Sequence, residues 1–331
     1  NDSDPACNLA RQALSKVVEV HPEFKSSLHP DITSWISVGW TSPHSPWTTD
    51  ELLAKPASEW ISDLLSFVQN EMEDPNLVGL MRAISEAVKS DFNWGIGLAE
   101  ALAKIGKWDS YLWSSLMQGW SEAELKEWQS KKVLTWLDKA ELYLVHAHEI
   151  AQFLLSLVKN DDKSLNITLL NHANKIGKIL WQSLDREDSG EKCDDWLMKA
   201  INHPAGVLAE FWLGSLSLWR MLQAPVPSTL NDDYREFFNL IIQDDTIVGR
   251  LGRSVLASQF DFLLTADESW ARENLLPLFD FDNNALEFQA AWHGYLTWGQ
   301  LSPTAADALE NYFLKSVQRV EHELTHMSNR F

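Results

Sequence analysis

Apolar residues recur at helical spacing along most of this chain. In residues 57–73 the apolar side chains fall on one stripe of a helix, formed by Trp60, Leu64, Phe67 and Val68. The same period predicts further helices, with boundaries uncertain by about 2–4 residues, over residues 5–20, 76–90, 93–106, 139–158, 164–184, 204–222, 246–266, 284–298 and 303–328. No sustained alternation of β-branched residues predicts a strand, so we expect an all-α fold.

Four polar or proline-containing stretches interrupt this pattern, at residues 27–50, 185–195, 223–233 and 278–284. The acidic turn at Asp188 is the best candidate for a boundary, and it predicts an N-terminal helical region (1–188) and a C-terminal helical region (189–331). Short polar links between the helices predict antiparallel pairs. The helices are too numerous for one bundle, so we expect an irregular helical-repeat, α-solenoid-like array of antiparallel helix pairs. One continuous array across residue 188 is the alternative.

One helix start is predicted by a capping box. Ser121 and Glu124 have the spacing at which a serine hydroxyl and a glutamate carboxylate satisfy each other's backbone N–H groups. The helix that follows would carry Leu125, Trp128, Leu134 and Trp136.

Tryptophan dominates the expected core. The 331 residues include 17 Trp and five Tyr, and a buried indole N–H needs a hydrogen-bond acceptor. The residues expected to be buried are Trp60, Trp136, Trp212, Leu263 and Trp292.

The chain is strongly acidic, with 47 Asp and Glu against 27 Lys and Arg and a formal net charge of −20. Phosphate backbones and anionic membranes attract positive surfaces, so neither nucleic acid nor membrane is an expected partner. No stretch approaches the roughly 20 apolar residues of a membrane span. The first residues lack the basic and apolar regions of a signal peptide.

The two cysteines, Cys7 and Cys193, form neither a metal-binding cluster nor a disulfide framework by spacing. This usage predicts a reducing, cytoplasmic location. The chain begins at Asn1 rather than Met, which suggests that it is part of a longer protein.

The stretch His322-Glu323-Leu324-Thr325-His326 is the only pattern with a specific chemical meaning. On a helix, two histidines four positions apart share a face and can hold Zn²⁺ while the intervening glutamate activates water. A catalytic zinc needs a third protein ligand, and five residues follow His326. We therefore expect no metal site and exposed histidines on a terminal helix. A zinc-dependent hydrolase that uses His322, Glu323 and His326 is the alternative.

The remaining histidines and glycines fit structural roles. His146 and His148 lie two positions apart in a helical stretch, so they point to different faces. His203 precedes Pro204, which predicts a turn into a helix. The stretch Gly95-Ile96-Gly97 lacks the strand and the later glycine of a dinucleotide-binding loop, so helix packing is expected there.

Paired acidic residues precede several helical stretches, at Asp194-Asp195, Asp232-Asp233 and Asp244-Asp245. Carboxylates at these places stabilise the positive end of a helix dipole. A paired-carboxylate hydrolase would need the fold to bring two of them together.

Three blocks in the last part of the chain match in order: AINHPAGVLAEFWL (200–213), VLASQFDFLLTADESWARENLLPLFDF (255–281) and EFQAAWHGYLTWGQLSP (287–303). They resemble the domain of unknown function found C-terminal to sirtuin-like NAD-hydrolase modules in bacterial anti-phage defence proteins. The resemblance covers about the last 130 residues and includes the stretch Trp292-His293-Gly294-Tyr295-Leu296.

The resemblance implies a regulatory role. In such proteins the sirtuin-like module would hydrolyse NAD⁺, and the helical part would hold the assembly together or detect infection. This chain has no glycine-rich NAD loop, so no catalytic residue and no cofactor is expected. The expected function is a non-catalytic sensor or assembly region of a bacterial anti-phage defence protein.

The expected partners are a protein trigger, such as a phage protein, and a sirtuin-like module in the same polypeptide. Assembly into a homo-oligomer and a generic helical scaffold function are alternatives.

Overall fold

A computed structural model describes residues 15–22, 44–67, 75–159, 166–187, 193, 195–325 and 327. The chain divides into two units, Asn1–His44 and Ser45–Phe331. In the first unit residues 15–20 form a helix. Every regular element among the described residues is a helix, which confirms the predicted all-α class.

The second unit is built from helices of very different lengths. Its first half contains α2 (Thr49–Leu53), α3 (Ala57–Ser66), α4 (Leu77–Ser90), α5 (Phe92–Lys104), α6 (Leu112–Glu122), α7 (Glu127–Leu137), α8 (Ala140–Tyr143), α9 (Ala147–Lys159) and α10 (Ile167–Ser183). Its second half contains α11 (Trp196–Ile201), α12 (Pro204–Met221), α13 (Asp232–Gln243), α14 (Ile247–Ser258), α15 (Phe260–Ala266), α16 (Glu268–Asn274), the 3₁₀ helix η2 (Leu276–Phe279), α17 (Ala285–Trp298), α18 (Pro303–Val317) and α19 (Val320–Glu323).

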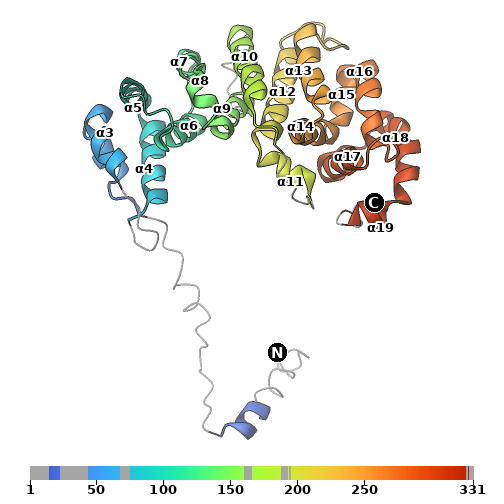
Figure 1. Ribbon diagram of the computed structural model, residues 1–331, viewed down its shortest axis with the longest axis horizontal. Coiled ribbons are helices and arrows are strands. Elements are labelled where there is room, and N and C mark those ends of the chain that lie inside the picture. The colour runs from blue at the N-terminus through green and yellow to red at the C-terminus, as the bar shows by residue number, and fades with distance from the viewer. Residues whose placement is uncertain are drawn as a thin grey trace. The chain divides into compact units, whose positions relative to one another are not determined.

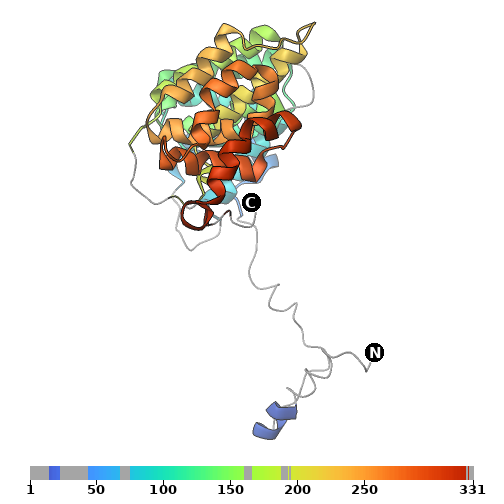
Figure 2. The same cartoon turned by 90° about the vertical axis from the view of Figure 1, so that its right-hand side faces the viewer.

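Six helices of this unit form a row in which each packs on the next: α4, α6, α9, α12, α14 and α17. Helices α5, α10 and α13 pack against successive members of the row, and α7 packs on α10. Figure 1 shows the helices of this unit following one another in chain order. In Figure 2, turned by 90°, the helices near the C-terminus are on the side that faces the viewer. This succession suits a stacked array of helix pairs, while its repeat character stays a prediction.

The buried core continues across residue 188. The ring of Trp181 on α10 lies 5.7 Å from that of Trp212 on α12, measured between centroids. Trp212 in turn stacks on Phe237 of α13 at 5.3 Å. Residues on both sides of 188 therefore share one core, and along the chain the boundary between the two units follows His44.

Several helices begin where the sequence supplies a side-chain acceptor. The amide oxygen of Asn76 accepts from Gly79 N at 3.0 Å and starts α4, and Asp91 accepts from Asn93 N at 2.8 Å and starts α5. His203 caps α12, whose first residue is Pro204, and its Nδ1 accepts from Ala205 N. The predicted turn into a helix at this position is confirmed.

Tryptophan rings fill the core as predicted. Trp60, Trp212, Leu263 and Trp292 are buried, and Trp136 is half-buried against the core. Trp60 and Trp94 both donate their indole N–H to the carbonyl of Leu52, at 3.0 and 3.1 Å. These bonds tie α2 to α3 and α5.

Glycines mark the places where helices approach most closely. A Cβ at Gly95 would lie 2.9 Å from Val88 Cγ1, and one at Gly119 would lie 2.6 Å from the carbonyl oxygen of Ser85. Gly95 therefore serves helix packing, as predicted. A Cβ at Gly97 would have Ala57 Cβ at 3.8 Å as its nearest neighbour, so this position has room for a side chain.

The predicted capping box at Ser121 and Glu124 is wrong. Ser121 lies inside α6, where its hydroxyl donates to the carbonyl of Met117 at 2.7 Å. Helix α7 begins later, at Glu127, with Lys126 at its N-cap position. Met117 and Trp120 are buried, and their packing extends α6 through Ser121. This packing outweighs the capping preference of the Ser121-Glu124 spacing.

The predicted single helix over 303–328 is also wrong. Helix α18 ends at Val317, and α19 is one turn long. Leu309 is buried, whereas Phe313 and Val317 are 36% and 51% exposed. The break allows Leu324 to be fully buried and places the Arg319 guanidinium 4.0 Å from the centroid of the Phe281 ring.

Candidate binding groove

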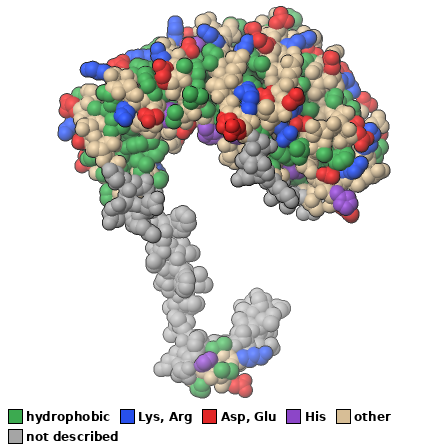
Figure 3. All heavy atoms as spheres, in the orientation of Figure 1, with side chains coloured by type: hydrophobic (Ala, Val, Ile, Leu, Met, Phe, Trp, Pro, Cys, Tyr) green, Lys and Arg blue, Asp and Glu red, His purple; other side chains and the backbone are tan. Residues whose placement is uncertain are grey.

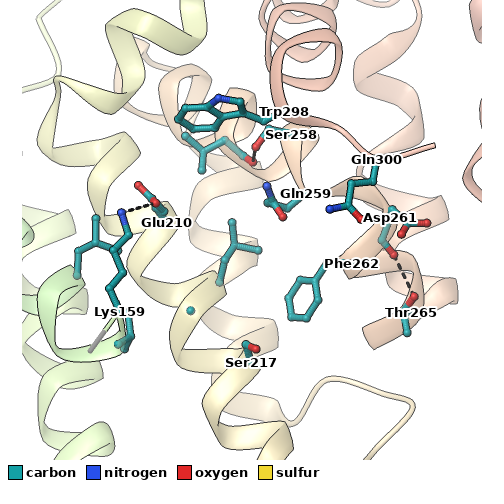
Figure 4. A pocket seen from close by; sticks show the side chains of 15 residues that line it. Lys159, Glu210, Ser217, Ser258, Gln259, Asp261, Phe262, Thr265, Trp298 and Gln300 are labelled. Carbon is teal, nitrogen blue, oxygen red and sulfur yellow. Dashed lines mark hydrogen bonds and ion pairs between the residues drawn. The ribbon is translucent and has the colours of Figure 1, made fainter. Parts of the chain in front are cut away.

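The described part of Ser45–Phe331 contains an open groove of about 560 Å³. Helices α9, α12, α14 and α15 and the end of α17 supply its walls. Its floor is apolar, formed by Leu155, Val158, Leu213 and Val255. Two aromatic side chains line it from above and below in Figure 4, Trp298 and Phe262. Trp298 is 44% exposed, so its ring presents apolar surface at the groove.

Charged side chains lie at two edges of the groove. Lys159 Nζ lies 2.8 Å from Glu210 Oε1, and this pair joins the end of α9 to α12. On the opposite side, Asp261 accepts a hydrogen bond from the hydroxyl of Ser302. Both groove carboxylates therefore already have partners within the protein.

Tyr295 holds the segment that follows α17 against the groove. Its hydroxyl donates to the carbonyl of Gln300, a groove residue, at 3.3 Å. Burial, and to a lesser extent the negative charge of Asp261, raises the pKa of Tyr295. The phenol therefore stays protonated and keeps this donor at neutral pH.

Arg220 lies at the end of the groove formed by Phe262 and Thr265. Its Nη2 donates to the carbonyl of Thr265 at 3.3 Å, and its Cζ lies 5.8 Å from the centroid of the Phe262 ring. The Nε atom is buried and has no hydrogen-bond partner among the described residues. The groove thus combines an apolar floor and two aromatic walls with one lining cation, Lys159, and Arg220 contacts its Phe262–Thr265 end from outside the lining.

His146 takes part in a polar cluster that has the residue types of a catalytic triad. Ser114 donates to Glu149 Oε1 at 2.8 Å, and its hydroxyl lies 3.4 Å from His146 Nδ1. His146 Nε2 lies 3.0 Å from the carbonyl of Trp108, so the ring nitrogen that would face a carboxylate is occupied by backbone. Burial lowers the pKa of His146, and the side chain is 3% exposed. The cluster joins α6 to α9.

His203, which was predicted to have a structural role, lies near His148. Burial lowers the pKa of His203, and the neighbouring charges of His148 and Lys199 lower it further. The neutral ring keeps the Nδ1 lone pair that caps α12.

The acidic pairs have mixed roles. Asp195 caps α11 by accepting from Met198 N, and Asp232 and Asp233 lie in the first turn of α13. Asp244 accepts from Thr246 N ahead of α14 and also pairs with Arg186 Nε at 3.2 Å. Asp194 and Cys7 lie outside the described residues, and Cys193 is half-buried.

The C-terminal motif is divided by the end of α19. His322 is exposed, and the carboxylate of Glu323 accepts from Gln289 Nε2 at 2.9 Å. Leu324 takes non-helical dihedral angles at the C-cap, and its side chain is buried. His326 lies outside the described residues. Within the described residues no group of three His, Cys, Asp or Glu side chains is placed to hold a metal ion.

We expect replacement of both His322 and His326 by Ala to change the free energy of unfolding by no more than about 0.5 kcal/mol, because His322 is exposed and the sequence predicts the same of His326. Leu324→Ala should cost about 2–5 kcal/mol, since it empties a buried site. Chemical unfolding followed by circular dichroism measures both changes. One tightly held zinc per chain, lost in the double variant together with a peptidase activity, would contradict this expectation.

Charged side chains of both signs are interspersed over the face of the Ser45–Phe331 unit drawn in Figure 3. This face therefore carries basic groups among its acidic ones. In the part of the chain that the structure describes, no helix has both the length and the apolar character to cross a membrane.

No protein-family model matches this chain, and no curated protein or solved structure was found to be similar to it. The resemblance of the three C-terminal blocks to the defence-associated domain therefore stays a prediction. All three blocks contribute to the groove, for example through Leu213, Phe262 and Trp298.

Proposed function

We propose that this chain is a non-catalytic interaction region and that the groove between α9, α12, α14, α15 and α17 binds a segment of a protein partner. The observation that carries this proposal is the apolar floor beside the exposed ring of Trp298. Tryptophan is among the residues most enriched at the centres of protein interfaces, where a large ring loses its hydration on binding.

The side chains with catalytic potential support the same proposal through their contacts. The imidazole of His146 and the carboxylate of Glu323 each join two separate segments, and the imidazole of His203 caps α12. A zinc hydrolase would need Glu323 turned toward a water molecule, whereas its carboxylate accepts from α17. We therefore favour an interaction role over the zinc-dependent alternative.

The biological setting follows from the resemblance alone. We propose that this region serves as the sensor or assembly part of a bacterial anti-phage defence protein, with a separate sirtuin-like module as the effector. A partner segment seated in the groove would then report on infection or join subunits.

The test compares two matched substitutions in the 331-residue chain. Thr265 and Thr135 are both exposed helical threonines whose hydroxyls donate to the carbonyl four residues earlier, but only Thr265 lines the groove. Peptides are selected on the wild-type chain from a random displayed library, and their affinities are measured by biolayer interferometry. We expect Thr265→Trp to weaken the selected peptides at least about tenfold, or 1.4 kcal/mol.

Thr135→Trp on α7 should leave these affinities unchanged. Circular dichroism and thermal melting establish that both variants remain folded. Selected peptides that bind wild type and Thr265→Trp equally well would remove the groove from consideration and, with it, the proposed function.

A further inference from the structure

Arginines in the interior of this protein are paired with carboxylates, and Arg220 is the exception. Among the described arginines that are buried or half-buried, four have a carboxylate within 3.2 Å: Arg186 with Asp244, Arg250 with Glu287, Arg253 with Glu287 and Arg272 with Glu268. Arg220 is half-buried, and its polar partner among the described residues is the carbonyl of Thr265. A guanidinium that loses water without gaining an anion is costly, so its site favours a carboxylate that arrives with a ligand.

The surroundings of Arg220 favour an anion on an apolar segment. Phe262 lies below its guanidinium and also forms a wall of the groove. The groove carboxylates of Glu210 and Asp261 are engaged by Lys159 and Ser302, so neither neutralises Arg220. A ligand that places an apolar side chain on the floor therefore meets an unneutralised cation at the end of the same groove.

We infer that the groove selects a protein segment in which a carboxylate, from Asp, Glu or a chain terminus, neighbours apolar side chains, and that Arg220 binds this carboxylate. The inference rests on the proposed function of the groove. The planar guanidinium suits two parallel hydrogen bonds to a carboxylate, and the buried Nε supplies one donor of such a fork. Apolar side chains of the segment would lie on the floor, against Trp298.

The experiment uses the full chain and a random displayed peptide library. Selections are run in parallel on wild type, Arg220→Gln and Arg272→Gln, and clones that also bind Thr265→Trp are removed as independent of the groove. Gln retains a donor for the Thr265 carbonyl but removes the charge. Arg272 is a matched control because its Nε already pairs with Glu268 at 2.8 Å on α16, outside the groove.

We expect groove-dependent peptides from wild type and from Arg272→Gln to be enriched in Asp and Glu, and this enrichment to be absent from Arg220→Gln. For single selected peptides, replacing the acidic residue by its amide should weaken binding to wild type about tenfold and leave binding to Arg220→Gln unchanged. An effect of the peptide substitution that depends on Arg220 distinguishes a direct ion pair from a general loss of protein stability.

The outcomes are distinguishable. Groove-dependent peptides without acidic enrichment, or enriched in Lys and Arg, would overturn the role of Arg220 while the groove remained a binding site. An absence of groove-dependent peptides would overturn both proposals. A homo-oligomer in light scattering that dissociates in Thr265→Trp would show a second copy as the occupant and would overturn the inference that the groove takes a partner segment.

Discussion

Gly294→Ala is expected to lower the free energy of unfolding by about 3 kcal/mol or more, at the upper end of what overpacking costs in a core. A Cβ on Gly294 would lie 2.0 Å from the carbonyl oxygen of Ser254, in the closest crossing of α17 on α14. The obstructing atom belongs to backbone, so the two helices must separate to admit one methyl group. Chemical unfolding followed by far-ultraviolet circular dichroism measures the loss.

Gly97→Ala is the matched control, because it places the same methyl group inside α5. Its nearest neighbour would be Ala57 Cβ at 3.8 Å, which is ordinary van der Waals contact. Alanine is favoured over glycine in a helix interior by about 1 kcal/mol, so this variant should be as stable as wild type or more so. Equal stability of Gly294→Ala and Gly97→Ala would disprove the close crossing.

Glu287→Gln should destabilise the protein by about 3–5 kcal/mol, because it breaks a buried ion pair from one side. The carboxylate accepts from Arg253 Nε at 2.7 Å and from Arg250 Nε at 3.0 Å, and the three side chains are 5 to 12% exposed. Arg253 also donates to the carbonyls of Ile241 and Asp244 at the end of α13. Loss of the anion leaves two guanidinium groups without a counter-charge.

Glu268→Gln provides the comparison on an exposed helix. Glu268 pairs with Arg272 four residues later, and more than half of its side chain is exposed, so the pair contributes little. Unfolding experiments should place this variant within about 0.5 kcal/mol of wild type. If Glu287→Gln behaves in the same way, the buried triad has no structural importance.

Helical spacing and end signals predicted much of the fold from the sequence. Helices α4, α5 and α12 lie within about two residues of their predicted ranges, since Asn76, Asp91 and the pair His203-Pro204 each supply a local cap. Helix α13 was missed although its signal is present. Tyr234, Phe237, Phe238 and Ile241 have helical spacing and are buried, after Asn231 as the cap.

Other features depend on contacts that no local pattern contains. The groove draws its lining from residues 155–159, 210–217, 255–265 and 298–300. These segments come together through the packing of the helix row formed by α9, α12, α14 and α17. No local sequence pattern marks any of them as a site.

The exposed ring of Trp298 gives the protein an optical reporter of its own groove. An indole in contact with water is accessible to a neutral quencher such as acrylamide, whereas the rings of Trp113, Trp120, Trp181 and Trp212 are buried at 0 to 1% exposure. A segment that fills the groove should cover Trp298, shift its emission toward shorter wavelength and shield it from quenching. Trp298→Phe should remove this response, so that occupancy of the groove can be followed without a label.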